Sequence, residues 1–158
     1  MTETVALPGV SAADLAQIYR LAEAAFPREC CGFILAGGIR PAVNVIDRLH
    51  AADPASFERS AETGYALGPR DAIFLETSFD TDDPVLVLYH SHPNGRAYFS
   101  DEDTSRALFN GRPVYPGLLQ LVVGVNEDGA QEAGLFRFED GAFRETGRHV
   151  VTSVPAGP

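Results

Sequence analysis

Hydrophobic side chains form a helical repeat in one part of this chain and short apolar stretches in others, and each pattern predicts a type of element. Between positions 11 and 26 they recur every three or four residues, behind a serine and an aspartate that suit a helix N-terminus. Pro27 ends this predicted helix, because its ring and its missing N–H do not fit a helix interior. The short apolar stretch 33–36 then predicts a strand, and Gly37-Gly38 behind it is typical of a hairpin turn.

The rest of the chain predicts further strands and two more helices. Residues 42–49 predict the strand that returns from the hairpin, and Pro69 opens a second helix over 71–78. The segments that follow are a strand at 85–89, a helix at 100–109, a loop at 111–117 and strands at 118–125, 135–138 and 143–151. This order predicts an α/β or α+β domain with a mixed, curved β-sheet flanked by helices.

Length, composition and charge narrow the class of protein. The chain has 158 residues, of which 45% are hydrophobic, which is enough for one core and leaves little room for a second. We therefore expect one domain over residues 11–151, with an N-terminal extension at 1–10 and a disordered tail at 152–158. The formal net charge of -10 is spread along the chain, so repulsion from phosphates disfavours nucleic acid as a partner.

Targeting signals are not visible in the sequence. No apolar run reaches the roughly 18 residues of a membrane span, and the N-terminus lacks the basic start and apolar core of a signal peptide. We therefore expect a cytoplasmic protein that does not bind a membrane.

The candidate chemistry lies at the end of the predicted strand 85–89. His90 and His92 are two residues apart, which places both side chains on one face of a strand, as a chelating pair requires. Ser100 is placed to cap the next helix, and Asp103 falls in its first turn. Two imidazoles and one carboxylate form the ligand set of a catalytic zinc site that keeps a position for water. The same residues also allow another interpretation, with hydrogen-bonded core histidines and an ordinary capping pair.

The spacing His90-x-His92, seven residues, Ser100-x-x-Asp103 resembles the signature of the JAMM metalloproteases, also called the MPN-plus or JAB domain. The segment around Glu29, which precedes an apolar stretch, is similar to the one that holds an essential glutamate in small prokaryotic members. The resemblance covers most of the chain. It implies a deaminase-like fold, in agreement with the mixed sheet predicted above.

The resemblance also implies a role for each residue of the signature. It implies that one Zn²⁺ per chain is held by His90, His92 and Asp103. Glu29 would then be the general base, which takes a proton from water and delivers it to the leaving amine. Ser100 would either donate a hydrogen bond to the developing oxyanion or remain a helix cap.

The substrate is also a matter of resemblance. It implies hydrolysis of the amide or isopeptide bond after the C-terminal Gly-Gly of a ubiquitin-like protein, with a sulfur-carrier protein bearing a C-terminal cysteine or extension as the first choice. A Gly-Gly tail suits a narrow cleft, since glycine has no side chain to exclude it. Segments 57–68 and 112–117, where deubiquitinating relatives have recognition insertions, are short and favour a single small carrier. The alternative is a non-catalytic MPN-type binding scaffold, and a homodimer is compatible with either.

Two other enzyme classes lack their motifs. A zinc-dependent nucleobase deaminase needs a glutamate two residues after a histidine and a Pro-Cys-x-x-Cys element, whereas His90 is followed by His92 and the two cysteines are adjacent. A serine hydrolase of the nucleophile-elbow type needs Gly-x-Ser-x-Gly, which the sequence does not contain.

Four further residues have weaker hypotheses. Arg96, in the loop beside the site, is either a ligand for a substrate carboxylate or a solvated loop residue. Cys30 and Cys31 are adjacent, so a disulfide between them would be strained. They are either two small buried hydrophobic residues, or Cys31 is a thiol near the metal that occupies its open position. His50 is interpreted as a loop histidine.

Overall fold

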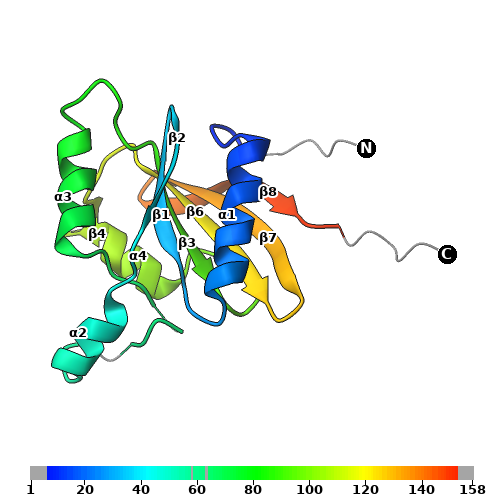
Figure 1. Cartoon of the computed structure of the whole chain (residues 1–158). Coiled ribbons are helices and arrows are strands. Elements are labelled where there is room, and N and C mark those ends of the chain that lie inside the picture. The colour runs from blue at the N-terminus through cyan, green and yellow to red at the C-terminus, as the bar shows by residue number, and fades with distance from the viewer. Residues whose placement is uncertain (1–6, 58, 63, 153–158) are drawn as a thin grey trace.

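The computed structural model describes residues 7–57, 59–62 and 64–152, which form helices around one large sheet (Figure 1). The helices are α1 (Ala12–Ala25), α2 (Ile46–Ala52), α3 (Pro69–Ser78) and α4 (Asp101–Ala107). The strands of the large sheet are β1 (Cys31–Leu35), β2 (Gly38–Ala42), β3 (Val87–His92), β6 (Leu119–Asn126), β7 (Gly129–Glu139) and β8 (Ala142–Val150). A separate small hairpin consists of β4 (Leu108–Phe109) and β5 (Arg112–Pro113).

The sheet is mixed, as the sequence predicts. Its strand order is β2-β1-β3-β6-β7-β8, with β3 and β6 parallel and every other neighbouring pair antiparallel. The connection from β3 to β6 contains α4, as expected of a crossover between parallel strands. Strand β3 therefore lies inside the sheet and is hydrogen-bonded on both sides. This pairing restrains the position of its C-terminal end.

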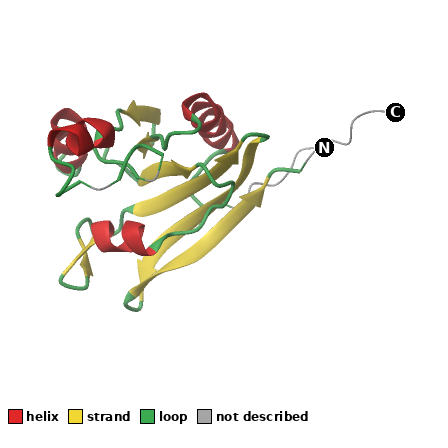
Figure 2. Ribbon diagram, turned by 90° about the horizontal axis from the view of Figure 1, so that it is seen from below, coloured by secondary structure: helices red, strands yellow, loops and turns green. Residues whose placement is uncertain are grey.

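Helices cover both faces of the sheet, so alternate side chains of β3 enter two different environments (Figure 2). Val87 and Tyr89 point to the face packed by α1, where the buried cluster also includes Leu15, Ile18, Ala22, Ile34, Leu121 and Val123. Leu88 points to the opposite face and packs with Leu75 of α3. Because His90 and His92 follow Leu88 at a spacing of two, they share its face and point away from α1.

The first helix agrees with its sequence signals. The side chain of Ser11 accepts a hydrogen bond of 3.1 Å from the backbone N–H of Asp14, and the helix ends at Ala25, just before Phe26-Pro27. Its buried residues are Leu15, Ile18 and Ala22. The chain then passes directly from this helix through Glu29 into β1.

One predicted element is wrong, and two others have different bounds. Residues 42–49 are not the returning strand: β2 covers Gly38–Ala42, with Pro41 on a sheet edge where its missing N–H costs no ladder bond, and α2 follows. The predicted helix 100–109 ends at Ala107, and the predicted loop 111–117 begins inside the β4–β5 hairpin. Asn110 and Gly111 both have positive φ, 52° and 76°, which matches an Asn-Gly hairpin turn.

The two ends of the predicted domain differ. Leu7 and Val10 are buried in the cluster under α1, so this part of the predicted N-terminal extension packs on the domain. Apart from residue 152, the predicted tail lies outside the described residues, as do positions 1–6. Within the described part of the chain, no helix combines the length and the apolar character needed to cross a bilayer.

Candidate metal centre

The two histidines of β3 lie at the end of a strand that is paired on both sides. His90 is opposite Cys31 of β1 and Val122 of β6, and His92 is opposite Gly124 of β6. Both imidazoles are buried, and their Nε2 atoms are 3.1 Å apart. The strand therefore presents two ring nitrogens at one point, as the spacing of two residues predicts.

A carboxylate joins these nitrogens from the start of α4. Ser100 and Asp103 form a capping box, in which the Ser100 hydroxyl accepts from the Asp103 N–H and Asp103 Oδ2 accepts from the Ser100 N–H, each at 3.0 Å. The same Oδ2 lies 3.1 Å from His90 Nε2 and 3.2 Å from His92 Nε2. The helix cap thus fixes the Asp103 carboxylate against both rings, and the capping and metal-ligand interpretations are compatible.

The three donor atoms suit a small divalent cation. They form a triangle with edges of 3.1, 3.1 and 3.2 Å. Tetrahedral zinc with ligand bonds of about 2.0 Å separates its ligands by about 3.3 Å, so small adjustments would seat the ion. Two imidazoles and one carboxylate are also a ligand set typical of zinc, with one position left for water. The residues present therefore fit the implied metal.

Glu29 reaches the same point from the segment that leads into β1. The Ser91 N–H donates to the Cys30 carbonyl at 3.0 Å, which extends the antiparallel pairing of β1 and β3 by one residue and brings Glu29 alongside His92. Ligand atoms of Glu29, His90 and His92 all lie within 4.8 Å of one another, and all three side chains are buried. Three buried groups that can bind a metal ion therefore meet at the end of β3, and Asp103 makes a fourth.

The backbone of Glu29 is fixed from the other side. Its N–H donates to the Ala61 carbonyl at 2.5 Å, and its carbonyl accepts from Asn44 Nδ2 at 2.9 Å. Asn44 also donates to the Gly64 carbonyl, and its Oδ1 accepts from the N–H groups of Ile46 and Ala66. This one side chain therefore holds Gly64 and Ala66 beside Glu29.

The two carboxylates have pKa values shifted in opposite directions. Burial raises the pKa of Glu29 to about 7, only partly opposed by the neighbouring His92. Burial also acts to raise the pKa of Asp103, but hydrogen bonds from His90 and His92 outweigh it and hold that pKa well below its ordinary value. Burial lowers the pKa of His90, which favours the neutral imidazole that metal binding requires. Asp103 is thus suited to remain an anion, and Glu29 to exchange a proton near neutral pH.

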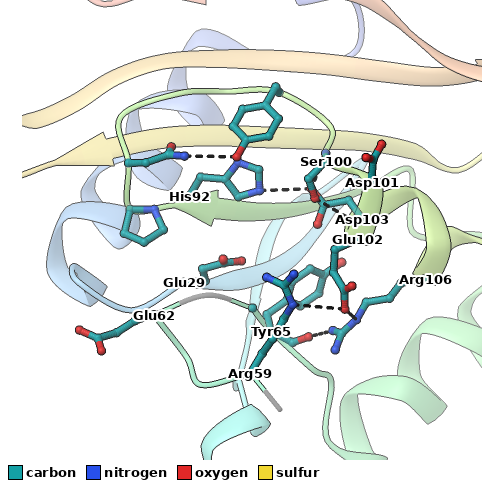
Figure 3. A pocket seen from close by; sticks show the side chains of 14 residues that line it. Glu29, Arg59, Glu62, Tyr65, His92, Ser100, Asp101, Glu102, Asp103 and Arg106 are labelled. Carbon is teal, nitrogen blue, oxygen red and sulfur yellow. Dashed lines mark hydrogen bonds and ion pairs between the residues drawn. The ribbon is translucent and has the colours of Figure 1, made fainter. Parts of the chain in front are cut away.

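Glu29, His92 and Asp103 line a cavity of about 550 Å³ (Figure 3). It is lined by Glu29, Arg59, Glu62, Gly64, Tyr65, His92, Pro93, Asn94, Tyr98, Ser100, Asp101, Glu102, Asp103 and Arg106. Across its wall, the Glu102 carboxylate lies between two guanidinium groups, 3.6 Å from Arg59 Nε and 3.4 Å from Arg106 Nε. Arg106 also donates to the Tyr65 carbonyl, which ties α4 to the segment beside Glu29.

Two aromatic residues that the sequence did not suggest cover the histidines. The ring of Tyr65 stacks on His90 with centroids 4.7 Å apart, and the ring of Tyr98 lies over His92 at 4.8 Å. Neither tyrosine belongs to the signature. Tyr65 precedes α3 by only a few residues and meets the site through tertiary contacts, so no local pattern could have revealed it.

The remaining candidate residues lie around the site rather than in it. Arg96 is exposed and is not among the described residues that line the cavity. Cys30 and Cys31 are both free, and burial raises the pKa of each thiol. His50 lies in the last turn of α2, so its interpretation as a loop histidine is wrong; its Nδ1 contacts the Phe57 carbonyl oxygen at 2.6 Å. A role for Arg96 or Cys31 at the site stays a prediction.

Comparison with known proteins gives a family and a fold. The family described as prokaryotic homologs of the JAB domain matches residues 11–136. Among solved structures, protein DSY2949 of Desulfitobacterium hafniense aligns with a TM-score of 0.61 and 17% identity over 86% of this chain and 87% of its own. A protein of Salinibacter ruber aligns with a TM-score of 0.54 and 21% identity over 94% of each chain. No curated protein matched the sequence. At these identities the structural likeness concerns the fold alone.

Proposed function

Because the chain belongs to the family of prokaryotic homologs of the JAB domain, we propose that it is a zinc-dependent peptidase or isopeptidase. Its substrate in this proposal is the amide bond after the C-terminal Gly-Gly of a ubiquitin-like protein, and a sulfur-carrier protein with a C-terminal cysteine or extension is the first candidate. The observation that supports it most is the triangle of His90 Nε2, His92 Nε2 and Asp103 Oδ2, with edges of at most 3.2 Å.

In this proposal the three triangle residues hold the ion and Glu29 moves the proton. A bound zinc ion supplies Lewis-acid chemistry, since it polarises a carbonyl group and lowers the pKa of water. Glu29 is buried beside His92, and its pKa of about 7 suits a group that accepts a proton and later releases it to the leaving amine. Asp103 instead forms the shortest contacts with both imidazoles, which favours it over Glu29 as the third ligand.

Ser100 has a defined place in the same proposal. Its hydroxyl oxygen accepts from the Asp103 N–H, which leaves the hydroxyl hydrogen available for another partner. The residue also lines the cavity together with Glu29 and His92. Ser100 can therefore cap α4 and donate to the oxygen of a substrate carbonyl at once, so the two interpretations of this residue do not exclude each other.

The cavity is compatible with a slender substrate. It is lined by backbone and side chains from the segment at 59–65, the loop after β3 and the first turns of α4. An extended Gly-Gly tail presents only backbone to this cavity, so its approach to His92 and Asp103 needs no room for side chains.

The test is intact-mass analysis of small ubiquitin-like sulfur carriers, each with a cysteine or a short extension after Gly-Gly. They would be incubated with the zinc-loaded protein and, as a matched control, with Glu29→Gln, which has the same shape but cannot take up a proton. We expect loss of the residues after Gly-Gly with the wild type only. Cleavage of no carrier by a protein that holds one equivalent of zinc would refute this substrate class and favour the binding scaffold.

A further inference from the structure

The loop between β3 and α4 joins the histidines to Asp103, and it is anchored at its middle. Ala97 is fully buried, its N–H donates to Glu132 Oε2 at 2.7 Å, and its carbonyl accepts from Arg148 Nη2 at 2.6 Å. A residue in a strand would find both partners on a neighbouring backbone. Here one acidic and one basic side chain, from β7 and β8, replace that backbone.

The two anchoring side chains also bind each other. Arg148 Nη1 donates to Glu132 Oε2 at 2.8 Å, and Arg148 Nε donates to Glu145 Oε1 at 2.9 Å. The guanidinium therefore meets three different acceptors with its planar set of donors: two carboxylates and the carbonyl of Ala97. A lysine ammonium lacks this geometry and could not meet all three at once.

The loop packs tightly against the sheet surface beneath it. A Cβ at Gly124 would lie 2.5 Å from the backbone of Gly95 and Arg96, and a Cβ at Gly134 would lie 3.0 Å from the Ala97 carbonyl. The Gly95 N–H also donates to the Val125 carbonyl at 3.0 Å. The loop is thus pressed against β6 and β7 and held there by Glu132 and Arg148.

The anchored loop determines what surrounds the metal centre. It leads from His92 to Ser100 and the capping box that orients Asp103, and it includes Tyr98, whose ring covers His92. Displacement of Ala97 would therefore move the carboxylate ligand relative to the two imidazoles. Arg148 lies in β8, beyond residue 136, where the family match ends.

We propose that Glu132 and Arg148 are positioning residues of the metal centre, which hold the loop so that Asp103 stays in register with His90 and His92. The inference rests on the proposed function, since it assumes that these three residues bind zinc. The competing explanation is that the pair only pins β7 to β8. The two explanations make different demands on the side chains. Anchoring the loop requires an acceptor at position 132 for the Ala97 N–H and a donor at position 148 for the Ala97 carbonyl, whereas pinning the strands requires only an ion pair in either orientation.

The test measures zinc affinity by competition with a chromophoric chelator, which requires no substrate. Arg148→Ala should bind zinc about tenfold more weakly than the wild type, at the low end of the effects seen for groups that support metal ligands. Arg148→Lys, the conservative variant, should lose less, since it can still donate to the Ala97 carbonyl. The matched control is Arg144→Ala, an exposed arginine of the same strand that donates to the Glu139 carbonyl, and it should bind like the wild type.

A charge exchange separates the two explanations. The double variant Glu132→Arg/Arg148→Glu can restore an ion pair between the strands but presents the wrong polarity to Ala97, so it should bind zinc at least as weakly as Arg148→Ala. Recovery of wild-type affinity in the exchange, or wild-type affinity in Arg148→Ala, would overturn the inference. A wild-type protein that binds no zinc would overturn the proposed function, and the inference with it.

Discussion

Replacing either carboxylate of the site by its amide should separate the third ligand from the base. Asp103→Asn keeps an oxygen that can accept from the Ser100 N–H, so the helix cap survives while the anion next to His90 and His92 is lost. Glu29→Gln removes an anion that lies close to the same imidazoles but outside the triangle. We expect Asp103→Asn to lose zinc affinity and Glu29→Gln to keep it.

The size of the effect follows from linkage. With free zinc at about 1,000 times the dissociation constant, binding stabilises the folded wild type by about 4 kcal/mol. For a chain of this length that corresponds to a rise in Tm of about 8–16 °C. Loss of a direct ligand should weaken binding by at least about 100-fold, beyond the range usual for groups that only support ligands. At the same zinc concentration, Asp103→Asn would then gain only about 1.4 kcal/mol, a rise of about 3–6 °C.

The assay is thermal unfolding of the wild type and both variants, with zinc and with a chelator, together with metal analysis of the dialysed proteins. The rise caused by zinc in Glu29→Gln should equal that of the wild type. If Asp103→Asn kept the full rise and one equivalent of zinc while Glu29→Gln lost them, Glu29 would be the third ligand. The assignment of the base would then be wrong as well.

Three further predictions concern the surroundings of the site. Ser100→Ala and Ser11→Ala each remove a helix cap, and each should lower the unfolding free energy by about 1 kcal/mol in urea titrations. Only Ser100→Ala should also reduce carrier cleavage, by about 100-fold or more. Equal cleavage by the two variants would show that Ser100 is only a helix cap. Gly124→Ala should lower the unfolding free energy by about 1–3 kcal/mol, because the new Cβ would meet the backbone of Gly95 and Arg96. Gly37→Ala, whose Cβ would have no atom within 4 Å, should change it by no more than about 0.5 kcal/mol. Similar urea midpoints for the two variants would contradict this packing. Cys31→Ser should leave zinc content and sensitivity to oxidants unchanged, because burial raises the pKa of the thiol and so disfavours the reactive thiolate; a variant resistant to oxidants would instead support a role for this thiol near the metal.

The sequence predicts those parts of the site that depend on residues close to one another along the chain. Strand alternation brings His90 and His92 to one face, and the cap fixes Asp103 three residues after Ser100, so local rules suffice for this half of the site. Glu29 approaches them only because β1 pairs with β3, some 60 residues away, and no periodicity predicts that register. Its place was expected from family resemblance rather than from the residues.

The parts that were missed depend on competition between local signals and tertiary contacts. Residues 42–49 have the composition of a strand, yet Asn44 binds four backbone groups from three segments and thereby holds a loop beside Glu29. The sequence predicts the end of α4 two residues too late, at 109 rather than at Ala107, because an apolar pair stands just before the Asn110-Gly111 turn signal. Tyr65 and Arg148 reach the site or its loop across the tertiary fold, where single-sequence patterns contain no information.

The double use of one oxygen, Oδ2 of Asp103, restricts how this position can change over evolutionary time. The atom accepts from the Ser100 N–H and faces both imidazoles, so the helix cap and the proposed metal ligand depend on the same side-chain length. A glutamate would be one methylene too long to keep both contacts, and an asparagine would keep only the cap. Both close analogues of aspartate would therefore lose one of the two contacts, so we expect very little variation at this position in proteins that use it as a metal ligand.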